Sequence, residues 1–379
     1  KEYTCKLCSE KKTEEISPSG VNNGFSAIGD KWYYYNDGSI SFSTTGVING
    51  TIHGIETGWY VKKGIVDFNY TGFVSDSQGD WYVKDGRITK NGEDVIKGTV
   101  GGVKAWWLVI DGMVTYITTT ATNVNGTWYI SNGKVDFDYT GFVETGNGYW
   151  YVKKGKVSTG TTGLILGKVN GITTWWYVVD NRVSFETTVA KNKYGWWYVN
   201  GGRIDTGYTG FGENQNGIWY CVNGKVDFEA EGLFKGTVRG ELTWWYVSGG
   251  KVLLDYKGFG SNAYGDYYCK DGKVTKETGI AKGIVKGEEA WWYVRTGKVR
   301  YETGLVKNSR GWWYVENGRI NLNYTGLASN ANGTYYCENG KLVDGKTGLI
   351  EGTIDGVSGI WYVKSSKVRF VDALIKQDG

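Results

Sequence analysis

One pattern recurs fifteen times along this chain of 379 residues: an aromatic residue, Tyr-Val or a close variant, two variable residues and Gly-Lys-Val. Successive copies follow after a short step of 21 or 22 residues or a long step of 25 or 26. Such copies fold as supersecondary units that share their hydrophobic faces with their neighbours. We call the first aromatic of each copy the aligned aromatic. The aligned aromatics are Tyr33, Trp59, Trp81, Trp107, Trp128, Trp150, Trp176, Trp197, Trp219, Trp245, Tyr267, Trp292, Trp313, Tyr335 and Trp361.

Each copy is predicted to form a β-hairpin. A glycine follows the aligned aromatic by five residues in thirteen copies, often directly after Asn or Asp. Such a pair accepts the positive φ angles of a two-residue type I′ turn. Asn181 and Ser366 replace the glycine in the other two copies. On the strand that returns from the turn, alternation predicts that Val135, Phe137 and Tyr139 share one face and form part of the core.

The copies are expected to stack, because a single two-stranded hairpin is marginally stable in water and needs a neighbour to cover its aromatic face. Sixty glycines, one proline, 19 Trp and 29 Tyr favour strands and turns over helices. Three of the five gaps between long units are 69 residues, the length of one long and two short steps, and the other two are 47 and 48. We therefore predict an all-β fold for residues 21–379, an elongated β-solenoid of about fifteen stacked β-hairpin repeats with three hairpins per turn.

Charge and hydropathy exclude two classes of partner. The formal charge of +4 comes from 43 basic and 39 acidic residues, and the lysines fall one or two per copy. Nucleic-acid-binding proteins concentrate basic residues along one stripe, so we expect no nucleic-acid partner. No stretch approaches the run of about eighteen apolar residues that a membrane-spanning helix requires, so we expect no membrane insertion. We also expect a monomer with no cofactor.

Residues that could support catalysis are sparse. The only histidine, His53, is predicted to be a solvated loop residue. Aspartates recur at Asp67, Asp136 and Asp227, and their recurrence indicates cross-strand partners of lysine rather than a unique acid. General acid-base catalysis needs a titratable group near its operating pH, and no such pair stands out, so we expect no enzymatic activity.

The five cysteines fall into two groups. Cys221, Cys269 and Cys337 each replace the Val that follows the aromatic pair, which predicts small buried hydrophobic residues. Cys5 and Cys8 form a single CxxC pair. Such a pair supplies half of a tetrahedral zinc site, but a local disulfide or two free thiols explains it without a metal, and we expect no metal site.

The repeat resembles a known family. Tyr139-Thr140-Gly141-Phe142-Val143, followed by Gly148-Tyr149-Trp150-Tyr151-Val152 and Gly155-Lys156-Val157, is similar to the cell-wall-binding or choline-binding repeats of Gram-positive surface proteins. Glucan-binding repeats and the repetitive carboxy-terminal domains of clostridial toxins look similar too. The resemblance covers residues 21–379 and implies an extracellular binding protein, secreted or at the bacterial cell surface. It also implies saccharide sites near the long units, as in the toxin-type repeats.

The chain departs from the choline-binding pattern at one step. In that family a Trp just after Thr-Gly completes a cage for the quaternary ammonium group through cation–π attraction. No tryptophan occupies this step here, so we do not expect choline to be the ligand. The residues at this step are Val47, Phe73, Phe142, Leu164, Phe211, Phe259, Ile280, Leu305, Leu327 and Leu349.

Residues 1–20 are expected to be the stub of a preceding module. Tyr3 through Cys8 and the segment up to Pro18 resemble the end of a small module of secreted proteins from gut Firmicutes. The chain begins within a motif, so we expect it to belong to a longer exported protein.

The candidate binding residues are tryptophans that directly precede the aligned aromatic. They face away from the aligned ring, and an exposed indole is a platform for sugar stacking and an anchor for interfaces. The alternative is that they pack between hairpins as structural filler. The candidates are Trp106, Trp175, Trp244 and Trp291 in long units, with Trp196 and Trp312 in short ones.

Three functions compete at this point. The first is a surface module that binds carbohydrate, such as a cell-wall polymer, a dietary polysaccharide or a host mucin glycan, through the exposed aromatics. The second is an adhesin-like repeat domain that binds a host protein such as an immunoglobulin, since recurring edges suit multivalent capture. The third is a passive spacer. The resemblance and the candidate tryptophans favour carbohydrate.

Overall fold

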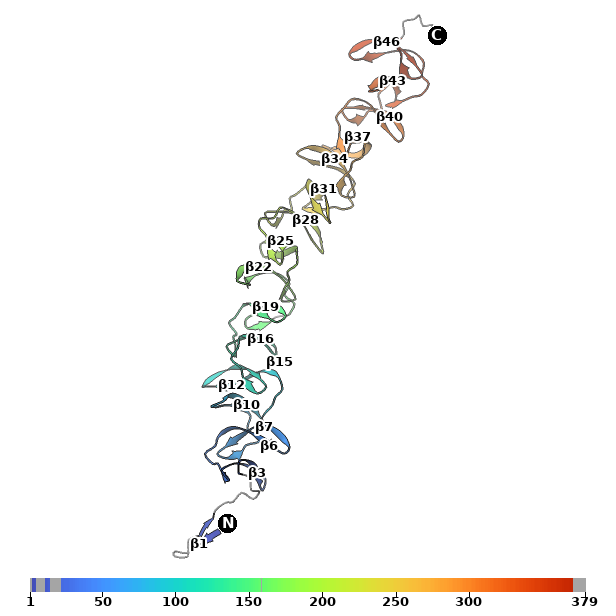
Figure 1. Ribbon diagram of the computed structural model, residues 1–379. Coiled ribbons are helices and arrows are strands. Elements are labelled where there is room, and N and C mark those ends of the chain that lie inside the picture. The colour runs from blue at the N-terminus through green and yellow to red at the C-terminus, as the bar shows by residue number, and fades with distance from the viewer. Residues whose placement is uncertain (1, 5–10, 14–21, 158, 371–379) are drawn as a thin grey trace. The chain divides into compact units, whose positions relative to one another are not determined.

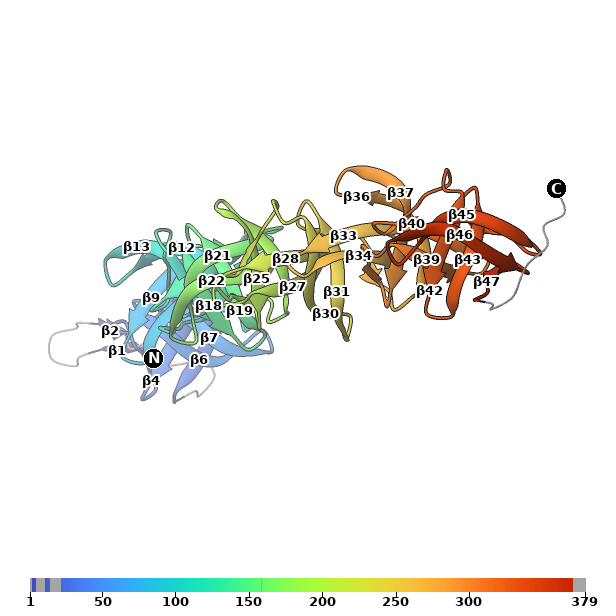
Figure 2. The same cartoon turned by 90° about the horizontal axis from the view of Figure 1, so that it is seen from above.

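The structure is a computed structural model that describes residues 2–4, 11–13, 22–157 and 159–370 (Figures 1 and 2). The described residues form strands and turns and no helix, so none of them makes a helix that could span a membrane. The chain divides into two compact units, residues 1–185 and 186–379, which we describe separately. Seven three-stranded repeats lie in the first unit and eight in the second, which confirms the predicted all-β fold of stacked hairpin repeats.

Each repeat contains an outer, a central and a return strand. In one example, β9 (Gly72–Asp76) pairs antiparallel with β10 (Gly79–Lys84), which pairs with β11 (Arg87–Ile88). The predicted hairpin is the smaller of two, formed by the central and return strands. The Thr-Gly step is the start of the outer strand, which forms a second and longer hairpin with the central strand.

The strands of the first unit follow this order from repeat to repeat. Its outer strands are β3 (Gly24–Ile28), β6 (Gly46–Ile52), β9, β12 (Glu93–Val100), β15 (Thr119–Asn123), β18 (Gly141–Thr145) and β21 (Gly163–Val169). Its central strands are β4 (Lys31–Asn36), β7 (Ile55–Lys62), β10, β13 (Val103–Ile110), β16 (Gly126–Ser131), β19 (Gly148–Lys153) and β22 (Ile172–Val179). Its return strands are β5 (Ser39–Ile40), β8 (Ile65–Val66), β11, β14 (Met113–Val114), β17 (Lys134–Val135), β20 (Lys156–Val157) and β23 (Arg182–Val183). Before them, β1 (Glu2–Thr4) pairs with β2 (Lys11–Thr13).

The second unit repeats the same order. Its outer strands are β24 (Thr188–Asn192), β27 (Gly210–Asn214), β30 (Gly232–Val238), β33 (Gly258–Asn262), β36 (Gly279–Val285), β39 (Gly304–Asn308), β42 (Gly326–Asn330) and β45 (Gly348–Ile354). Its central strands are β25 (Gly195–Asn200), β28 (Gly217–Val222), β31 (Glu241–Ser248), β34 (Gly265–Lys270), β37 (Glu288–Arg295), β40 (Gly311–Glu316), β43 (Gly333–Glu338) and β46 (Val357–Lys364). Its return strands are β26 (Arg203–Ile204), β29 (Lys225–Val226), β32 (Lys251–Val252), β35 (Lys273–Val274), β38 (Lys298–Val299), β41 (Arg319–Ile320), β44 (Lys341–Leu342) and β47 (Lys367–Val368).

The predicted turn joins the central and return strands, and its backbone conformation is as expected. Asn132 and Gly133 have φ angles of 48° and 79°, as a type I′ turn requires. Asn181 and Ser366 adopt φ angles of 67° and 63° in place of glycine. The threonine of the Thr-Gly step ties this turn to the outer strand, as where Thr140 Oγ1 accepts the N–H of Lys154 at 3.0 Å.

The return strand is shorter than predicted. It ends at Val135, so Phe137 and Tyr139 do not continue a strand face. Asp136 explains the end, because its carboxylate accepts the backbone N–H of Asp138 at 3.0 Å and closes an Asx turn. Asp67 and Asp227 accept the N–H of the residue two positions later in the same way. The prediction that these aspartates are cross-strand partners of lysine is therefore wrong.

Consecutive repeats are joined because the return strand of one pairs with the central strand of the repeat before it. Trp107 on β13 lies in register with Lys134 on β17. The N–H of Leu108 donates to the carbonyl of Gly133 at 2.8 Å, and the N–H of Gly133 donates to the carbonyl of Ile117 at 3.0 Å. Both the N–H and the carbonyl of the turn glycine are thus hydrogen-bonded to the preceding repeat.

Long repeats differ from short ones in their outer hairpin. The outer and central strands of a short repeat have five and six residues, whereas a long repeat has seven or eight and eight. The extension changes the partner of the aligned indole. Trp107 in a long repeat donates its Nε1–H to the carbonyl of Gly98 at 3.2 Å. Trp128 in a short repeat donates to Asn123 Oδ1 at 3.1 Å.

A glycine on each long outer strand receives a side chain from the repeat before it. A Cβ on Gly98 would lie 2.4 Å from the ring of Phe73, and one on Gly167 would lie 2.6 Å from Phe142. Phenylalanine at the Thr-Gly step is therefore accommodated by the long hairpin that follows it. This is a structural role for the residues that replace the cage tryptophan of the choline-binding pattern.

The core contains the residue two positions after each aligned aromatic. Val61, Val83 and Val152 are fully buried there, and so are Cys221 and Cys269 at the same position. Cys337 is also fully buried, and all three cysteines are free thiols, which confirms their prediction as small buried residues. Cys5 and Cys8 lie outside the described residues, as does most of the proposed stub at residues 1–20.

Candidate functional site

The six candidate tryptophans lie on central strands, and they differ in exposure. Trp291 is the most open, with 42% of its surface exposed, on the long hairpin β36–β37 that Figure 2 shows projecting from its unit. The other five are half-buried. Trp106 and Trp175 sit on long hairpins of the first unit, and Trp244 sits on one in the second.

Several of these indoles pack on aromatic rings of the next repeat. Trp196 stacks on Trp219, with ring centres 6.5 Å apart and planes 19° apart. Trp312 belongs to a cluster that includes Tyr335. Trp244 meets Tyr264 edge-on at 5.9 Å. These tryptophans therefore pack between hairpins in part, as the structural alternative to a binding role predicted.

A second relationship links consecutive repeats: a cation from the return strand of one repeat lies over the aligned aromatic of the repeat before it. We call this contact the cation clamp. In the part of the chain that the structure describes, nine such contacts have distances of 5.2–6.0 Å between the cationic group and the ring centre, within the range of cation–π attraction. The pairs are Lys134 with Trp107, Lys156 with Trp128, Lys225 with Trp197, Lys251 with Trp219, Lys273 with Trp245, Lys298 with Tyr267, Arg319 with Trp292, Lys341 with Trp313 and Lys367 with Tyr335.

In short repeats a glycine makes room for the clamp. Gly217 lies two residues before Trp219, and a Cβ added to it would lie 2.3 Å from Lys251 Cε. Gly126 has the same relation to Lys156 Cε, at 2.6 Å. Glycine at this position lets the aliphatic part of the lysine cross the central strand and bring its ammonium group to the ring.

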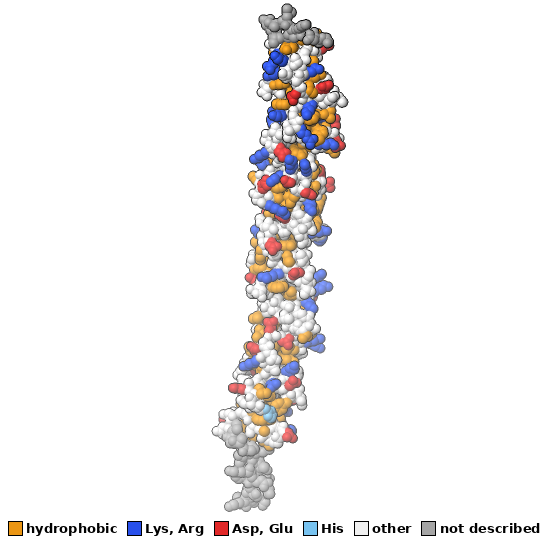
Figure 3. Space-filling view, turned by 90° about the vertical axis from the view of Figure 1, so that its right-hand side faces the viewer, with side chains coloured by type: hydrophobic (Ala, Val, Ile, Leu, Met, Phe, Trp, Pro, Cys, Tyr) orange, Lys and Arg blue, Asp and Glu red, His pale blue; other side chains and the backbone are white. Residues whose placement is uncertain are grey.

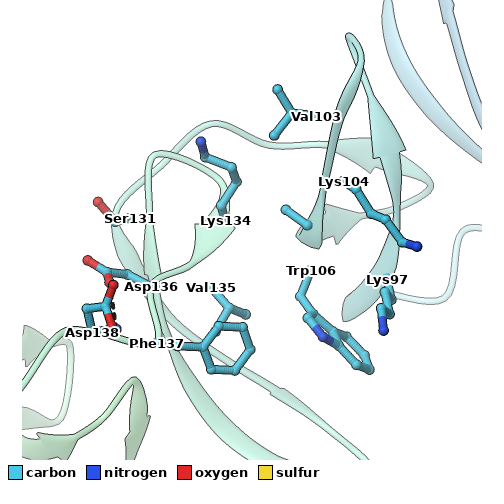
Figure 4. A pocket seen from close by; sticks show the side chains of 11 residues that line it. Lys97, Val103, Lys104, Trp106, Ser131, Lys134, Val135, Asp136, Phe137 and Asp138 are labelled. Atoms are coloured by element: carbon cyan, nitrogen blue, oxygen red, sulfur yellow. Dashed lines mark hydrogen bonds between the residues drawn. The ribbon is translucent and has the colours of Figure 1, made fainter.

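Trp106 lines a surface groove with a volume of about 680 Å³ (Figure 4). One wall is the long hairpin of β12 and β13, and the other is the return strand β17 with the Asx turn that follows it. Figure 4 shows the indole of Trp106 and the ring of Phe137, which come from the two opposite walls of the groove. We call this site the Trp106 groove. It is lined by Lys97, Val103, Lys104, Ala105, Trp106, Ser131, Lys134, Val135, Asp136, Phe137 and Asp138.

A recess of about 360 Å³ adjoins the groove, sharing Trp106, Val135 and Phe137 with it. Trp128 lines the recess, and Phe137 meets its ring edge-on at 5.5 Å. The ammonium group of Lys156 lies 5.2 Å from the centre of the Trp128 ring. Three aromatic side chains from two consecutive repeats therefore surround one open site that carries polar groups at its edge.

The sequence predicted Trp106 but not the side chains around it. Phe137 was assigned to the core, yet 48% of its surface is exposed. The sequence did contain a signal for the role of Phe137, because an aromatic residue lies nine positions after the aligned aromatic in eight copies. Seven of these eight aromatics meet their aligned ring edge-on: Phe68, Tyr116, Phe137, Phe185, Phe228, Tyr301 and Phe370.

Trp312 lines a groove of about 380 Å³ whose other residues are mostly small or charged. His53 is exposed in a turn with a φ of 51°. In the described part of the chain no three His, Cys, Asp or Glu side chains gather as a metal site would require. On the face shown in Figure 3, basic side chains lie among acidic and hydrophobic ones without forming a continuous stripe.

Sequence comparison gives a family match. The profile of the choline-binding repeat family matches eleven segments, which together cover more than half of the chain. A comparison with curated proteins gave no match. The matched segments are residues 49–67, 69–89, 118–136, 138–158, 185–205, 207–227, 234–253, 255–275, 280–300, 301–321 and 323–343.

Two similar solved structures are crystal structures of choline binding protein F from Streptococcus pneumoniae. The first, in crystal form II, is 16% identical with a TM-score of 0.26. The second, solved in the presence of a peptidoglycan analogue, a tetrasaccharide-pentapeptide, is 16% identical with a TM-score of 0.20. Each match covers 93% of this chain and 100% of the other.

Proposed function

Because the chain belongs to the choline-binding repeat family, we propose that it is a non-catalytic binding module of the bacterial cell surface that holds carbohydrate in the Trp106 groove. The observation that carries the proposal is the gathering of Trp106, Trp128 and Phe137 around the recess that adjoins this groove and shares Trp106 and Phe137 with it. Flat aromatic faces beside a few polar groups suit the apolar faces and hydroxyl groups of sugar rings.

Two features argue for carbohydrate rather than choline as the ligand. The Thr-Gly step lacks the cage tryptophan, and its phenylalanines instead occupy the space above glycines such as Gly98. In addition, the cation clamp places a lysine or arginine of the chain itself over nine of the fifteen aligned rings. A quaternary ammonium ligand would compete there with an ammonium group that is covalently held in place.

The cell surface is the expected location. The choline-binding and cell-wall-binding repeats that this chain resembles belong to Gram-positive surface proteins, which supports an extracellular, secreted or wall-attached module. A cell-wall polymer is then the nearest available ligand. The following experiment distinguishes a cell-wall polymer from the other candidate ligands, which are dietary polysaccharide, mucin glycan and a host protein such as an immunoglobulin.

The test is a binding titration of the full chain with soluble cell-wall fragments, plant polysaccharide oligomers, mucin glycans, choline and immunoglobulin. We expect saccharide binding that Trp106→Ala weakens by at least about tenfold, since a central aromatic anchor contributes roughly 2 kcal/mol or more. Trp291→Ala is the matched control, because it removes a more exposed tryptophan from an equivalent hairpin position. Saccharide binding that survives Trp106→Ala would overturn the proposed site, and binding of choline or immunoglobulin with no saccharide would overturn the proposed ligand.

A further inference from the structure

The Trp106 groove differs in its charge from the equivalent sites on two long hairpins of the second unit. In the second unit, the clamp cation beside each of two long hairpins is neutralised by a glutamate at the hairpin tip. Lys273 pairs with Glu241 at 2.6 Å, and Arg319 pairs with Glu288. The position equivalent to Glu241 in the Trp106 groove is Val103, since each follows the tip turn in the same register.

The same contrast holds on the hairpin face that carries the tryptophan. Trp291 lies in register with Lys282, which pairs with Glu289 at 3.1 Å. Trp106 lies in register with Lys97, and the position equivalent to Glu289 is Lys104. A carboxylate at one hairpin is therefore replaced by an ammonium group at the other.

Three lysines consequently line the Trp106 groove, and among the described residues none of them forms an ion pair. Lys97 and Lys104 are exposed and Lys134 is half-buried. The two carboxylates of the groove, Asp136 and Asp138, belong to the Asx turn, and Figure 4 shows them on the far side of the groove from Trp106. The half of the groove around Trp106 is therefore cationic.

We infer that the Trp106 groove selects saccharides that carry an anionic group. This inference rests on the proposed function and names its substrate class. A sugar ring stacks on Trp106, while a carboxylate or phosphate accepts charge-assisted hydrogen bonds from Lys97 and Lys104, with Lys134 adding positive charge across the groove. The anion comes either from a uronic acid or from a phosphodiester-linked glycopolymer, and both present the same negative charge next to a sugar.

The test measures binding of the full chain to three saccharides: a galacturonic acid tetrasaccharide, the neutral galactose tetrasaccharide of the same linkage, and a poly(ribitol phosphate) substituted with N-acetylglucosamine. We expect an anionic saccharide to bind at least about tenfold more tightly than the neutral one, and this preference to shrink as salt is raised. Whichever anionic saccharide binds more tightly identifies the source of the charge. Inorganic polyphosphate is the control for charge without sugar.

Two variants introduce into the Trp106 groove the carboxylates that other long hairpins carry at the equivalent positions. Val103→Glu supplies the partner that Lys273 has in Glu241, and Lys104→Glu copies Glu289. We expect each to weaken anionic binding by about tenfold and neutral binding by a smaller factor, because the added carboxylate repels the anion. Lys168→Glu, an exposed lysine on the long hairpin of β21 and β22, is the matched control.

The outcomes separate this inference from the proposed function. Equal binding of neutral and anionic saccharides would overturn the anionic selectivity and leave carbohydrate binding intact. Polyphosphate that binds as tightly as the anionic saccharides would also overturn it, since the site would then attract charge without recognising sugar. Failure of every saccharide to bind would overturn the proposed function itself.

Discussion

The ammonium group of Lys156 lies 5.2 Å from the centre of the Trp128 ring, which belongs to the repeat before it. The contact is possible because Lys156 pairs in register with Trp128, and because Gly126 leaves room for the lysine side chain. Its recurrence gives the lysine of the Gly-Lys-Val motif a role in joining neighbouring repeats. A cation–π contact of this exposure contributes about 0.5–1 kcal/mol, so the clamps matter through their number.

Completing a missing clamp should stabilise the chain. Met113 takes the lysine position opposite Trp81, and Gly79 is already present at the position that makes room. We expect Met113→Lys to raise the free energy of unfolding by about 0.5 kcal/mol, because a cation would then lie over the Trp81 ring. Urea denaturation followed by tryptophan fluorescence measures this change. An unchanged or lower denaturation midpoint would contradict the prediction.

Closing the space for a clamp should have the opposite effect. Gly217 has a φ of 135°, and a Cβ there would collide with Lys251. We expect Gly217→Ala to lower the free energy of unfolding by about 1–3 kcal/mol through backbone strain and loss of the clamp. Gly146 has nothing within 4 Å of a built Cβ and no positive φ, so Gly146→Ala is the control and should leave stability nearly unchanged. Equal effects of the two substitutions would show that the clamp geometry is unimportant.

The contact between Phe73 and Gly98 should behave as a coupled pair. A Cβ at position 98 would lie 2.4 Å from the Phe73 ring, so we expect Gly98→Ala to destabilise the chain by about 1–3 kcal/mol. Adding Phe73→Val, which places at this step the residue found at Val47, should recover part of the loss. A double-mutant cycle measured by thermal unfolding gives the coupling energy. Additive effects would mean that the two residues do not contact one another.

The buried cysteines should be unreactive in the folded chain. Burial raises the pKa of the Cys221 and Cys269 thiols to about 12, from an ordinary value of 9.0. Both thiols therefore stay protonated at pH 8, and we expect a disulfide reagent to modify them only after unfolding. The measurement uses a Cys5→Ser, Cys8→Ser background, with the urea-unfolded chain as the control. Rapid modification of the native chain would contradict this assignment.

The same shift predicts how stability depends on pH. The folded chain keeps these thiol protons at pH values where the unfolded chain releases them, so raising the pH favours unfolding. The contribution is fully present below about pH 9 and is lost as the pH rises toward about 12. Cys221→Val and Cys269→Val, which copy the residue of other repeats, should reduce this loss. Urea denaturation midpoints between pH 8 and pH 11 provide the test.

The sequence by itself determined what depends on local periodicity. The fifteen copies, the positive-φ turns at positions such as Asn132, and the burial of Cys221 all follow from patterns within one repeat. They could be predicted because a type I′ turn and strand alternation depend on residues that are close along the chain. Trp106 was found in the same way, as a tryptophan on the face opposite the aligned aromatic.

The tertiary structure decided what depends on the register between repeats. Lys134 reaches Trp107 because β17 pairs with β13 of the preceding repeat, and an Asx turn at Asp136 brings Phe137 to the Trp106 groove. Neither contact follows from a pattern inside one copy. The sequence could thus name six similar tryptophans, but only the pairing of return strand to central strand showed that Trp106 shares an open site with rings of the next repeat and with lysines that form no ion pair among the described residues. The physical reason is that side chains about 27 residues apart meet only when backbone hydrogen bonds between repeats fix their alignment.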